Sequence, residues 1–263
     1  MRPEETMVCG LPAVRALFAR HAPAIKRLYF DYATGRRLGV MCRALAAARK
    51  TYRCVVPEEL AKIAGTSHHG GVVAVIDRHP PPRPLREDLA RWARERRPLL
   101  LLDGVSNAHN LGAIVRTAAF FGVGIVVVSE DPRQAAPGDA AHRVAEGGMA
   151  CVDLYRVPVL AEFIRDLSPA FEVIGTAVRS AAKLKAFTRP TGRDSRPIAL
   201  VLGNEERGLS PAVAAACEHL VIIPGAGAIE SLNVSAAAAI LIHHFVGDRL
   251  ACAVLQPGLI DGG

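Results

Sequence analysis

The sequence lacks any stretch that is both long and apolar enough to cross a bilayer. Its apolar runs GIVVVS and ALVLGN have the length of single strands, and its alanine-rich segment ends at His243 and His244. The N-terminal residues MRPEETMVCGLPAV also lack the apolar block of a signal peptide. We therefore expect a cytoplasmic protein with no membrane partner.

Signatures of several cofactor sites are missing as well. The six cysteines are scattered, with no CxxC pair and no metal-ligand spacing, so we expect reduced thiols and no bound metal. The Gly-Lys-Ser/Thr of a P-loop is absent. The segment GAGAIE, residues 225–230, fails the GxGxxG dinucleotide pattern because Glu230 replaces its last glycine. These absences disfavour a dinucleotide-dependent oxidoreductase.

The positive charge of the chain is concentrated in its first third. Residues 1–76 carry 12 Lys and Arg against 5 Asp and Glu, whereas residues 99–263 carry 13 against 16. A basic module joined to a nearly neutral one is typical of an enzyme that binds a polyanion with one domain and catalyses the reaction with the other. The alternative is that the arginines cover solvated helix faces. The distribution favours nucleic acid as the partner.

A proline-rich stretch, RHPPPRPLRED, divides the chain, and we interpret residues 78–84 as a linker. Before it, residues 1–77 alternate between helix and strand patterns that predict a small α/β domain. After it, residues 85–263 alternate apolar strands with helices, which is typical of a parallel sheet covered on both faces. We interpret residues 179–196 within this part as a basic loop. Ligands of such sheets bind beyond the carboxyl ends of the strands, so the loops there are candidate sites.

The loop after the strand expected at residues 99–103 carries Asn107, His109 and Asn110 and leads into a helix. Asn110 can cap that helix. Arg116 lies further along, beside an apolar stripe, where an arginine is costly unless it has a partner or reaches water. Its guanidinium therefore either extends into solvent or is fixed to bind a phosphate or a ribose.

Two further loops carry polar residues that a core does not need. In VLGNEERGLSP, Gly203 either lets a ligand approach the backbone or belongs to a simple turn with solvated charges. In IIPGAGAIESLNVS, the helix expected at 231–247 opens with Ser231, Asn233 and Ser235, although one of them suffices as a cap. Because all three loops follow strands of one predicted sheet, they can line one crevice.

Together the three loops resemble the signature motifs of the SpoU family of RNA 2′-O-ribose methyltransferases, within the SPOUT superfamily. The matching segments are NLGAIVRTAAFFG, LGNEERGL and IPGAGAIESLNVSAAAAI, in the family's order over residues 99 to about 248. HHGGVVAVID resembles, more loosely, the close of the substrate-binding domain in ribosomal-RNA members. The resemblance implies an α/β parallel sheet with a C-terminal trefoil knot, preceded by a small α/β (L30e-like) domain.

The resemblance also implies S-adenosyl-L-methionine as cofactor, RNA as partner (ribosomal RNA before transfer RNA) and a homodimer in which the partner chain completes each site. It implies catalytic roles for Asn110, Arg116, Glu205, Ser231 and Asn233. It implies cofactor contacts for Leu202, Gly203, Ile223, Gly227 and Leu232.

Within this set, we expect Arg116 to bind the target phosphate rather than to act as a base, because a guanidinium rarely gives up its proton. Glu205 is either a proton acceptor or a partner of Arg116. Gly225 replaces the Met of many members, and Asn107-Ala-His-Asn110 departs from the usual Asp-Pro-x-Asn. Two alternatives remain open: an RNA-binding protein of this fold without turnover, and an enzyme that methylates a base nitrogen.

Overall fold

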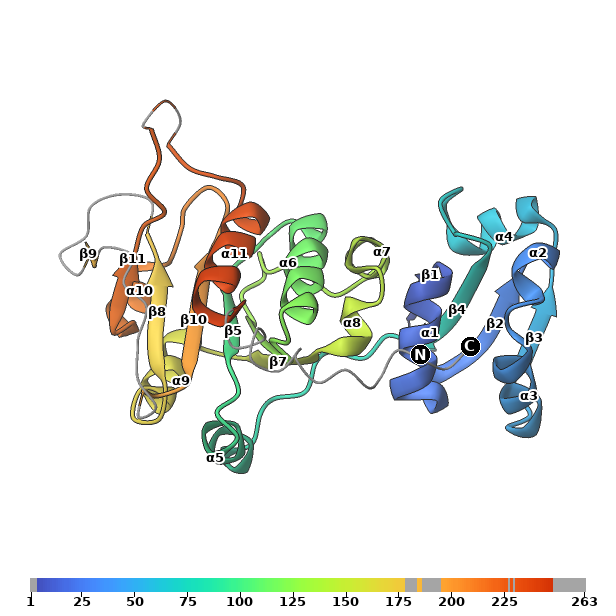
Figure 1. Cartoon of the computed structure of the whole chain (residues 1–263), viewed down its shortest axis with the longest axis horizontal. Helices are drawn as coiled ribbons and strands as arrows, with labels where there is room; N and C mark the ends of the chain where they lie inside the picture. Colours follow the sequence, from blue (N-terminus) through green and yellow to red (C-terminus); the bar gives the residue numbers. More distant parts are fainter. Residues whose placement is uncertain (1–3, 178–183, 186–194, 227, 229, 248–263) are drawn as a thin grey trace.

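The computed structural model describes residues 4–177, 184–185, 195–226, 228 and 230–247, and contains two sheets (Figure 1). The first sheet has the strand order β1-β4-β2-β3, in which only β2 and β3 run parallel. Its elements are β1 (Glu5–Cys9), α1 (Leu11–His21), the 3-10 turn η1 (Ala22–Ala24), β2 (Ile25–Phe30), α2 (Tyr32–Gly35), α3 (Gly39–Ala47), β3 (Thr51–Cys54), α4 (Pro57–Ala64) and β4 (Val72–Asp77).

Helices pack on both faces of this first sheet. Val72 and Ala74 of β4 point to the face covered by α1 and α3, whereas Val73 between them packs against Leu60 of α4. This alternation makes an α/β sandwich of the predicted kind. The strand β1 was not predicted, because its five residues form a strand only through pairing with β4, where Val8 lies opposite Ala74.

The proline-rich stretch runs without regular structure from Arg78 to Leu85. Prolines lack the N–H donor, but their carbonyl oxygens accept: Arg156 donates from its backbone N to Pro82 O at 3.0 Å and from Nε to Pro81 O at 2.9 Å. The linker is therefore fixed along the edge of the second sheet.

The second sheet has the order β7-β6-β5-β10-β8-β11-β9, and every neighbouring pair is parallel. Its strands are β5 (Leu99–Asp103), β6 (Ile125–Ser129), β7 (Asp153–Val157), β8 (Glu172–Thr176), β9 (Leu184–Lys185), β10 (Ile198–Gly203) and β11 (His219–Val221). Its helices are α5 (Arg86–Arg94), α6 (Ala108–Phe120), α7 (Asp139–Ala145), α8 (Gly148–Cys151), α9 (Leu160–Leu167), α10 (Pro211–Ala216), α11 (Val234–Ile242) and the π-helical η2 (His243–Gly247).

Both faces of this sheet are buried, as the apolar strands predict. Leu100 and Leu102 of β5 join the core under α6, α7 and α11, whereas Leu99 and Leu101 join the opposite core, where Trp92 of α5 is fully buried. The predicted parallel α/β sheet is confirmed. The trefoil knot stays a prediction.

Within the described ranges, no helix is long and apolar enough to span a membrane. In the same part of the chain, no three His, Cys, Asp or Glu side chains are grouped so that they could hold a metal ion.

Candidate functional site

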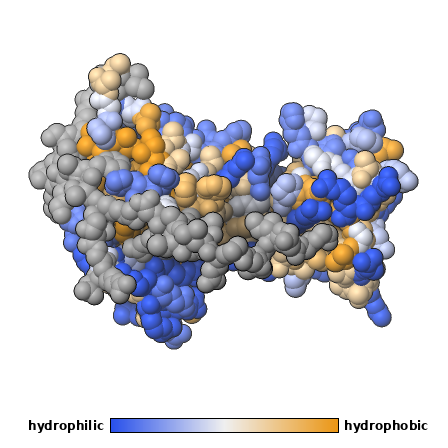
Figure 2. Space-filling model, viewed as in Figure 1, coloured by the Kyte–Doolittle hydropathy of each residue, from blue (hydrophilic) through white to orange (hydrophobic). Residues whose placement is uncertain are grey.

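A cavity of about 620 Å³ lies at the carboxyl ends of β8, β10 and β11. Its walls include Leu202, Gly203, Ile223, Ser231, Leu232 and Leu241. Four of the expected cofactor contacts therefore line one cavity, and Gly227 lies outside the described residues. Hydrophobic side chains gather on the molecular surface near the ends of β8 and β11 (Figure 2).

The packing around Gly203 supports one of its two expected roles, that of a residue in a tight turn. A Cβ atom at this position would lie 2.2 Å from the carbonyl carbon of Gly208, so the space beside Gly203 is filled by the chain itself. The backbones of Asn204 and Gly208 exchange two hydrogen bonds of 3.0 Å there. A glycine at position 203 therefore allows the loop after β10 to close, while its backbone also lines the cavity, where the expected cofactor contact stays a prediction.

Glu205 is surrounded by hydrogen-bond donors at the start of α6. Its carboxylate accepts from Ser106 N and Oγ, both at 3.1 Å, and from Asn107 N at 3.2 Å. It also accepts from Asn110 Nδ2 at 2.8 Å and from Asn204 Nδ2 at 3.1 Å. Burial alone would raise the pKa of Glu205, but the hydrogen bonds from Asn110 and from backbone amides lower it overall.

This environment disfavours the role of proton acceptor that was considered for Glu205. A carboxylate with a lowered pKa and five donors is a poor proton acceptor near neutral pH. Its negative charge lies at the positive end of the α6 dipole, which stabilises it further. We therefore assign Glu205 to positioning the start of α6 and the amide of Asn110.

Asn110 connects Glu205 to the last helix. Because its Nδ2 donates to Glu205, its Oδ1 is directed to Asn233, whose Nδ2 donates to it at 3.1 Å. Asn233 in turn accepts at its Oδ1 from Ser235 N at 2.8 Å and from Ser235 Oγ at 2.6 Å. These bonds confirm that the three loops converge at one edge of the sheet.

The expected cap of α6 is wrong by three residues, and one of the three candidate caps of the last helix is selected in the structure. The cap of α11 is Asn233, so Ser231 lies before the helix, where it lines the cavity. The cap of α6 is Asn107, which accepts from His109 N at 2.8 Å, and Asn110 lies in the first turn of that helix. Ser231 and Asn110 therefore do not cap a helix. This explains why the loops before α6 and α11 contain more polar residues than helix capping requires.

Of the expected catalytic residues, Glu205 and Ser231 line the cavity, Asn110 and Asn233 join Glu205 through hydrogen bonds, and Arg116 does neither. Arg116 Nη2 lies 2.9 Å from Glu146 Oε2, and both side chains are more than half exposed. The proposed pairing of Arg116 with Glu205 is therefore wrong within one chain. Sequence reasoning missed Glu146, and it also missed the donors Ser106 and Asn204 of the Glu205 cluster.

The first module presents aromatic and basic side chains just after β2. Tyr32 is 80% exposed at the start of α2, and Arg36 and Arg37 follow it on the surface. Such a pairing of a stacking surface with positive charge is typical of nucleic-acid contacts.

Comparison with known proteins identifies both parts of the chain. Residues 97–243 match the model of the SpoU rRNA methylase family, and residues 7–82 match the family model for RNA 2′-O ribose methyltransferase substrate binding. A 23S rRNA (guanosine-2′-O-)-methyltransferase of Nitrosomonas europaea is 36% identical over 238 residues, which is 89% of this chain and 88% of that protein. The enzyme of the same name from Pasteurella multocida is 36% identical over 253 residues, which is 93% of this chain and 98% of that one.

Two solved structures share the fold. The SpoU methyltransferase AviRb of Streptomyces viridochromogenes, solved with the cofactor AdoMet, has a TM-score of 0.68 at 24% identity and covers 94% of this chain and 91% of its own. An AdoMet-bound rRNA methyltransferase of Sinorhizobium meliloti has a TM-score of 0.70 at 23% identity, with 91% of this chain and 86% of that chain covered. The sequence matches and the shared fold agree, and this chain belongs to the SpoU rRNA methylase family.

Proposed function

We propose that this protein transfers the methyl group of S-adenosyl-L-methionine to a ribose 2′-hydroxyl of ribosomal RNA. The main observation behind this proposal is the cavity at the carboxyl ends of the strands. Glu205 lines this cavity and is hydrogen-bonded to Asn110, which is in turn hydrogen-bonded to Asn233. The related enzymes that act on 23S rRNA and the AdoMet-bound structures of the same fold support the proposal.

The cavity fits an adenosine-bearing cofactor. Its volume lies within the range of small-molecule sites, and its walls combine apolar side chains with main-chain groups. We assign Leu202, Gly203, Ile223 and Leu232 to holding the nucleoside, and Gly227 by resemblance alone. When bound, the cofactor supplies an electrophilic methyl carbon on a sulfonium, so the protein has to align the hydroxyl oxygen with it.

The residues of the chain then have separate tasks. Glu205 fixes Asn110, and Asn110 fixes Asn233, so two amide side chains are held rigidly near the cavity. Ser231 does not cap α11 but lines the cavity, and we assign it to contacting the substrate there. We assign Arg116 to binding the target phosphate and so orienting the 2′-oxygen.

Because Arg116 does not line the cavity of its own chain, we propose that the active form is a homodimer. The family resemblance implies that the partner chain completes each site, and we assign this part to Arg116, which would face the cavity of the other subunit. A second subunit also explains why a catalytic arginine is exposed in the single chain.

We further propose that residues 1–77 bind the RNA, residues 78–84 link the parts and residues 85–263 carry out the transfer. The basic first module and the match of residues 7–82 to a substrate-binding family support this division. Ribosomal RNA is favoured over transfer RNA by the named activities of the relatives, and this substrate implies a cytoplasmic location.

The proposal is tested with tritiated S-adenosyl-L-methionine and transcripts of 23S, 16S and transfer RNA, followed by nucleoside digestion and mass spectrometry. We expect a 2′-O-methylated nucleoside from 23S rRNA. A methylated base would instead identify a base-nitrogen enzyme. Binding of S-adenosyl-L-methionine without product on any RNA would identify an RNA-binding protein without turnover.

A further inference from the structure

The first module contacts the second domain through α1 and β1. Ala150 of α8 belongs to the hydrophobic core of the first module, and Arg20 of α1 donates from Nη1 to Ala150 O at 3.3 Å. On the other side, Asp139 of α7 accepts from Met7 N at 3.2 Å and pairs with Arg78 at 3.3 Å. The two parts are therefore joined through the segment that contains α7 and α8.

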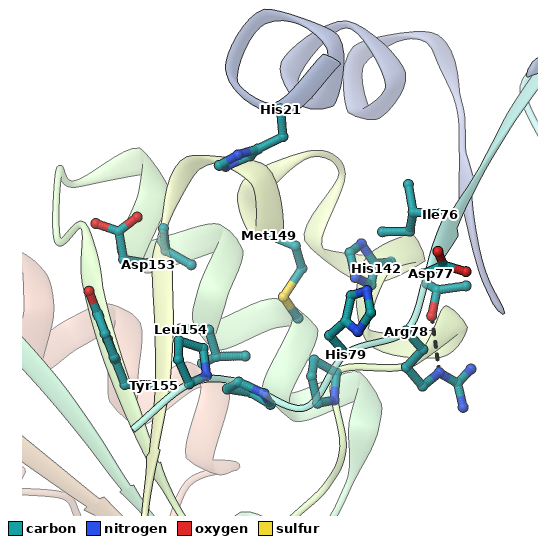
Figure 3. A pocket seen from close by; sticks show the side chains of 15 residues that line it. His21, Ile76, Asp77, Arg78, His79, His142, Met149, Asp153, Leu154 and Tyr155 are labelled. Carbon is teal, nitrogen blue, oxygen red and sulfur yellow. Dashed lines mark hydrogen bonds between the residues drawn. The ribbon is translucent and has the colours of Figure 1, made fainter. Parts of the chain in front are cut away.

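A cavity of about 340 Å³ lies at this junction, and Figure 3 shows its lining from both parts of the chain: His21 of α1, His79 of the linker and His142 of α7. Burial lowers the pKa of His142 to about 4, so this imidazole is neutral at pH 7. The junction thus holds no buried positive charge at this histidine.

The turn at 146–148, which follows α7 and includes Gly148, the first residue of α8, is packed between α1 and α6. A Cβ atom at Gly147 would lie 3.1 Å from Ala13 Cα and 3.3 Å from Ala16 Cβ, both in α1. A Cβ atom at Gly148 would lie 3.0 Å from Arg116 Cα in α6. The turn therefore touches the first module with one glycine and the helix that carries Arg116 with the next.

Glu146 begins this turn in an unusual conformation. Its φ of 44° and ψ of 42° are left-handed, a conformation that non-glycine residues adopt infrequently. From there its carboxylate pairs with Arg116. An ion pair with both side chains more than half exposed contributes little to stability.

We propose that Glu146 is a positioning residue for Arg116 and that the turn at 146–148 transmits the position of α1 to this arginine. The inference rests on the proposed function, because Arg116 matters only if it serves methyl transfer. RNA that binds to the first module and shifts α1 would move Gly147, and with it Glu146 and the guanidinium of Arg116. Substrate recognition by one module is in this way coupled to the catalytic arginine of the other.

The test compares Glu146→Gln and Ala16→Leu with two matched controls, Glu162→Gln at an exposed position of α9 and Ala19→Leu on the exposed side of α1. In Glu146→Gln we expect kcat on RNA to fall about tenfold while the affinity for S-adenosyl-L-methionine is unchanged, since a small misplacement of a reacting group is costly. Ala16→Leu should also lower kcat, but it should have no further effect in the Glu146→Gln background. Both controls should keep wild-type rates.

A second readout does not depend on activity. Phenylglyoxal modifies free guanidinium groups, and mass spectrometry of the Arg116 peptide gives its rate. We expect this rate to rise several-fold in Glu146→Gln and in Ala16→Leu, and to stay unchanged in the controls. If wild-type protein methylates RNA but neither test variant differs from its control, the inference is wrong and the proposed function stands. If wild-type protein has no activity, the proposed function is wrong, and an unchanged modification rate overturns the positioning of Arg116 as well.

Discussion

Asn233 donates a 3.1 Å hydrogen bond from Nδ2 to Asn110 Oδ1, across 123 positions of the sequence. The bond joins the start of the last helix to the start of α6, and Asn110 is itself held by Glu205. In this series of hydrogen bonds each amide nitrogen donates to the next residue, so the orientation of the Asn110 and Asn233 amide groups is fixed. Substitutions at these residues should therefore change the positions of the site side chains, and with them kcat, more than they change the free energy of unfolding.

Replacing Glu205 by Gln should lower kcat by about a hundredfold, the cost of a small misplacement at a reacting centre. The new amide group places N–H donors where Ser106, Asn107, Asn110 and Asn204 need an acceptor. Single-turnover methylation measures the effect. Glu206→Gln is the control, because Glu206 is exposed in the same loop. Equal rates for wild type and Glu205→Gln would contradict the positioning role.

The same variant gives a pH prediction. Because the pKa of Glu205 is lowered in the folded state, its charge stabilises the fold above the unfolded pKa, near 4.5, and this contribution is lost as the pH falls through the lowered value. The difference in free energy of unfolding between wild type and Glu205→Gln should be constant from about pH 8 to pH 6 and shrink below about pH 4. Urea unfolding across this range measures it, and a difference that grows towards acid pH would show a raised pKa instead.

Replacing Asn233 by Ala should cost about 1 kcal/mol of stability through the lost cap, together with most of the methyl-transfer rate. The control is Ser210→Ala, because Ser210 precedes α10 without a side-chain cap bond. Chemical unfolding and kcat are measured on both proteins. Loss of stability with full activity would leave Asn233 as a cap only.

Gly203→Ala should destabilise the protein by about 2 kcal/mol or more, because the added methyl would meet the backbone of Gly208. Gly225→Ala is a matched control in the next loop of the same cavity, since a Cβ atom there meets nothing within 4 Å. Thermal unfolding compares the two. Similar melting temperatures would show that the loop after β10 can open.

Charge on the first module should govern RNA affinity. Replacing Arg36 and Arg37 together by Ala should weaken binding and reduce the slope of log K against log salt by about 0.7–0.9 for each RNA phosphate that the variant no longer neutralises. Arg165→Ala, at an exposed position of α9, should leave the slope unchanged. Filter binding at several salt concentrations tests this, and an unchanged slope in the double variant would place the RNA elsewhere.

The parallel sheet and the convergence of the motif loops could be predicted, because carboxyl ends of parallel strands meet at one edge whatever the sequence between them. The hydrogen-bond partners of the site residues at that edge could not be predicted. Ser106 and Asn204 reach Glu205 through backbone turns whose shape no local pattern specifies. Ser231 and Asn233 are equally good caps by residue type, and only the path of the chain chooses Asn233.

The pairing of Arg116 was unpredictable for a different reason. It depends on the left-handed backbone of Glu146 and on the packing of two glycines between separate helices. The charge pattern of the sequence contains no such information.

The most direct measurement is a crystal structure of the protein with S-adenosylhomocysteine. We expect a homodimer with the nucleoside between Leu202, Ile223 and Leu232, and with Arg116 of the other subunit facing the same cavity. A nucleoside bound elsewhere, or an Arg116 side chain remote from both cavities of the dimer, would contradict the account.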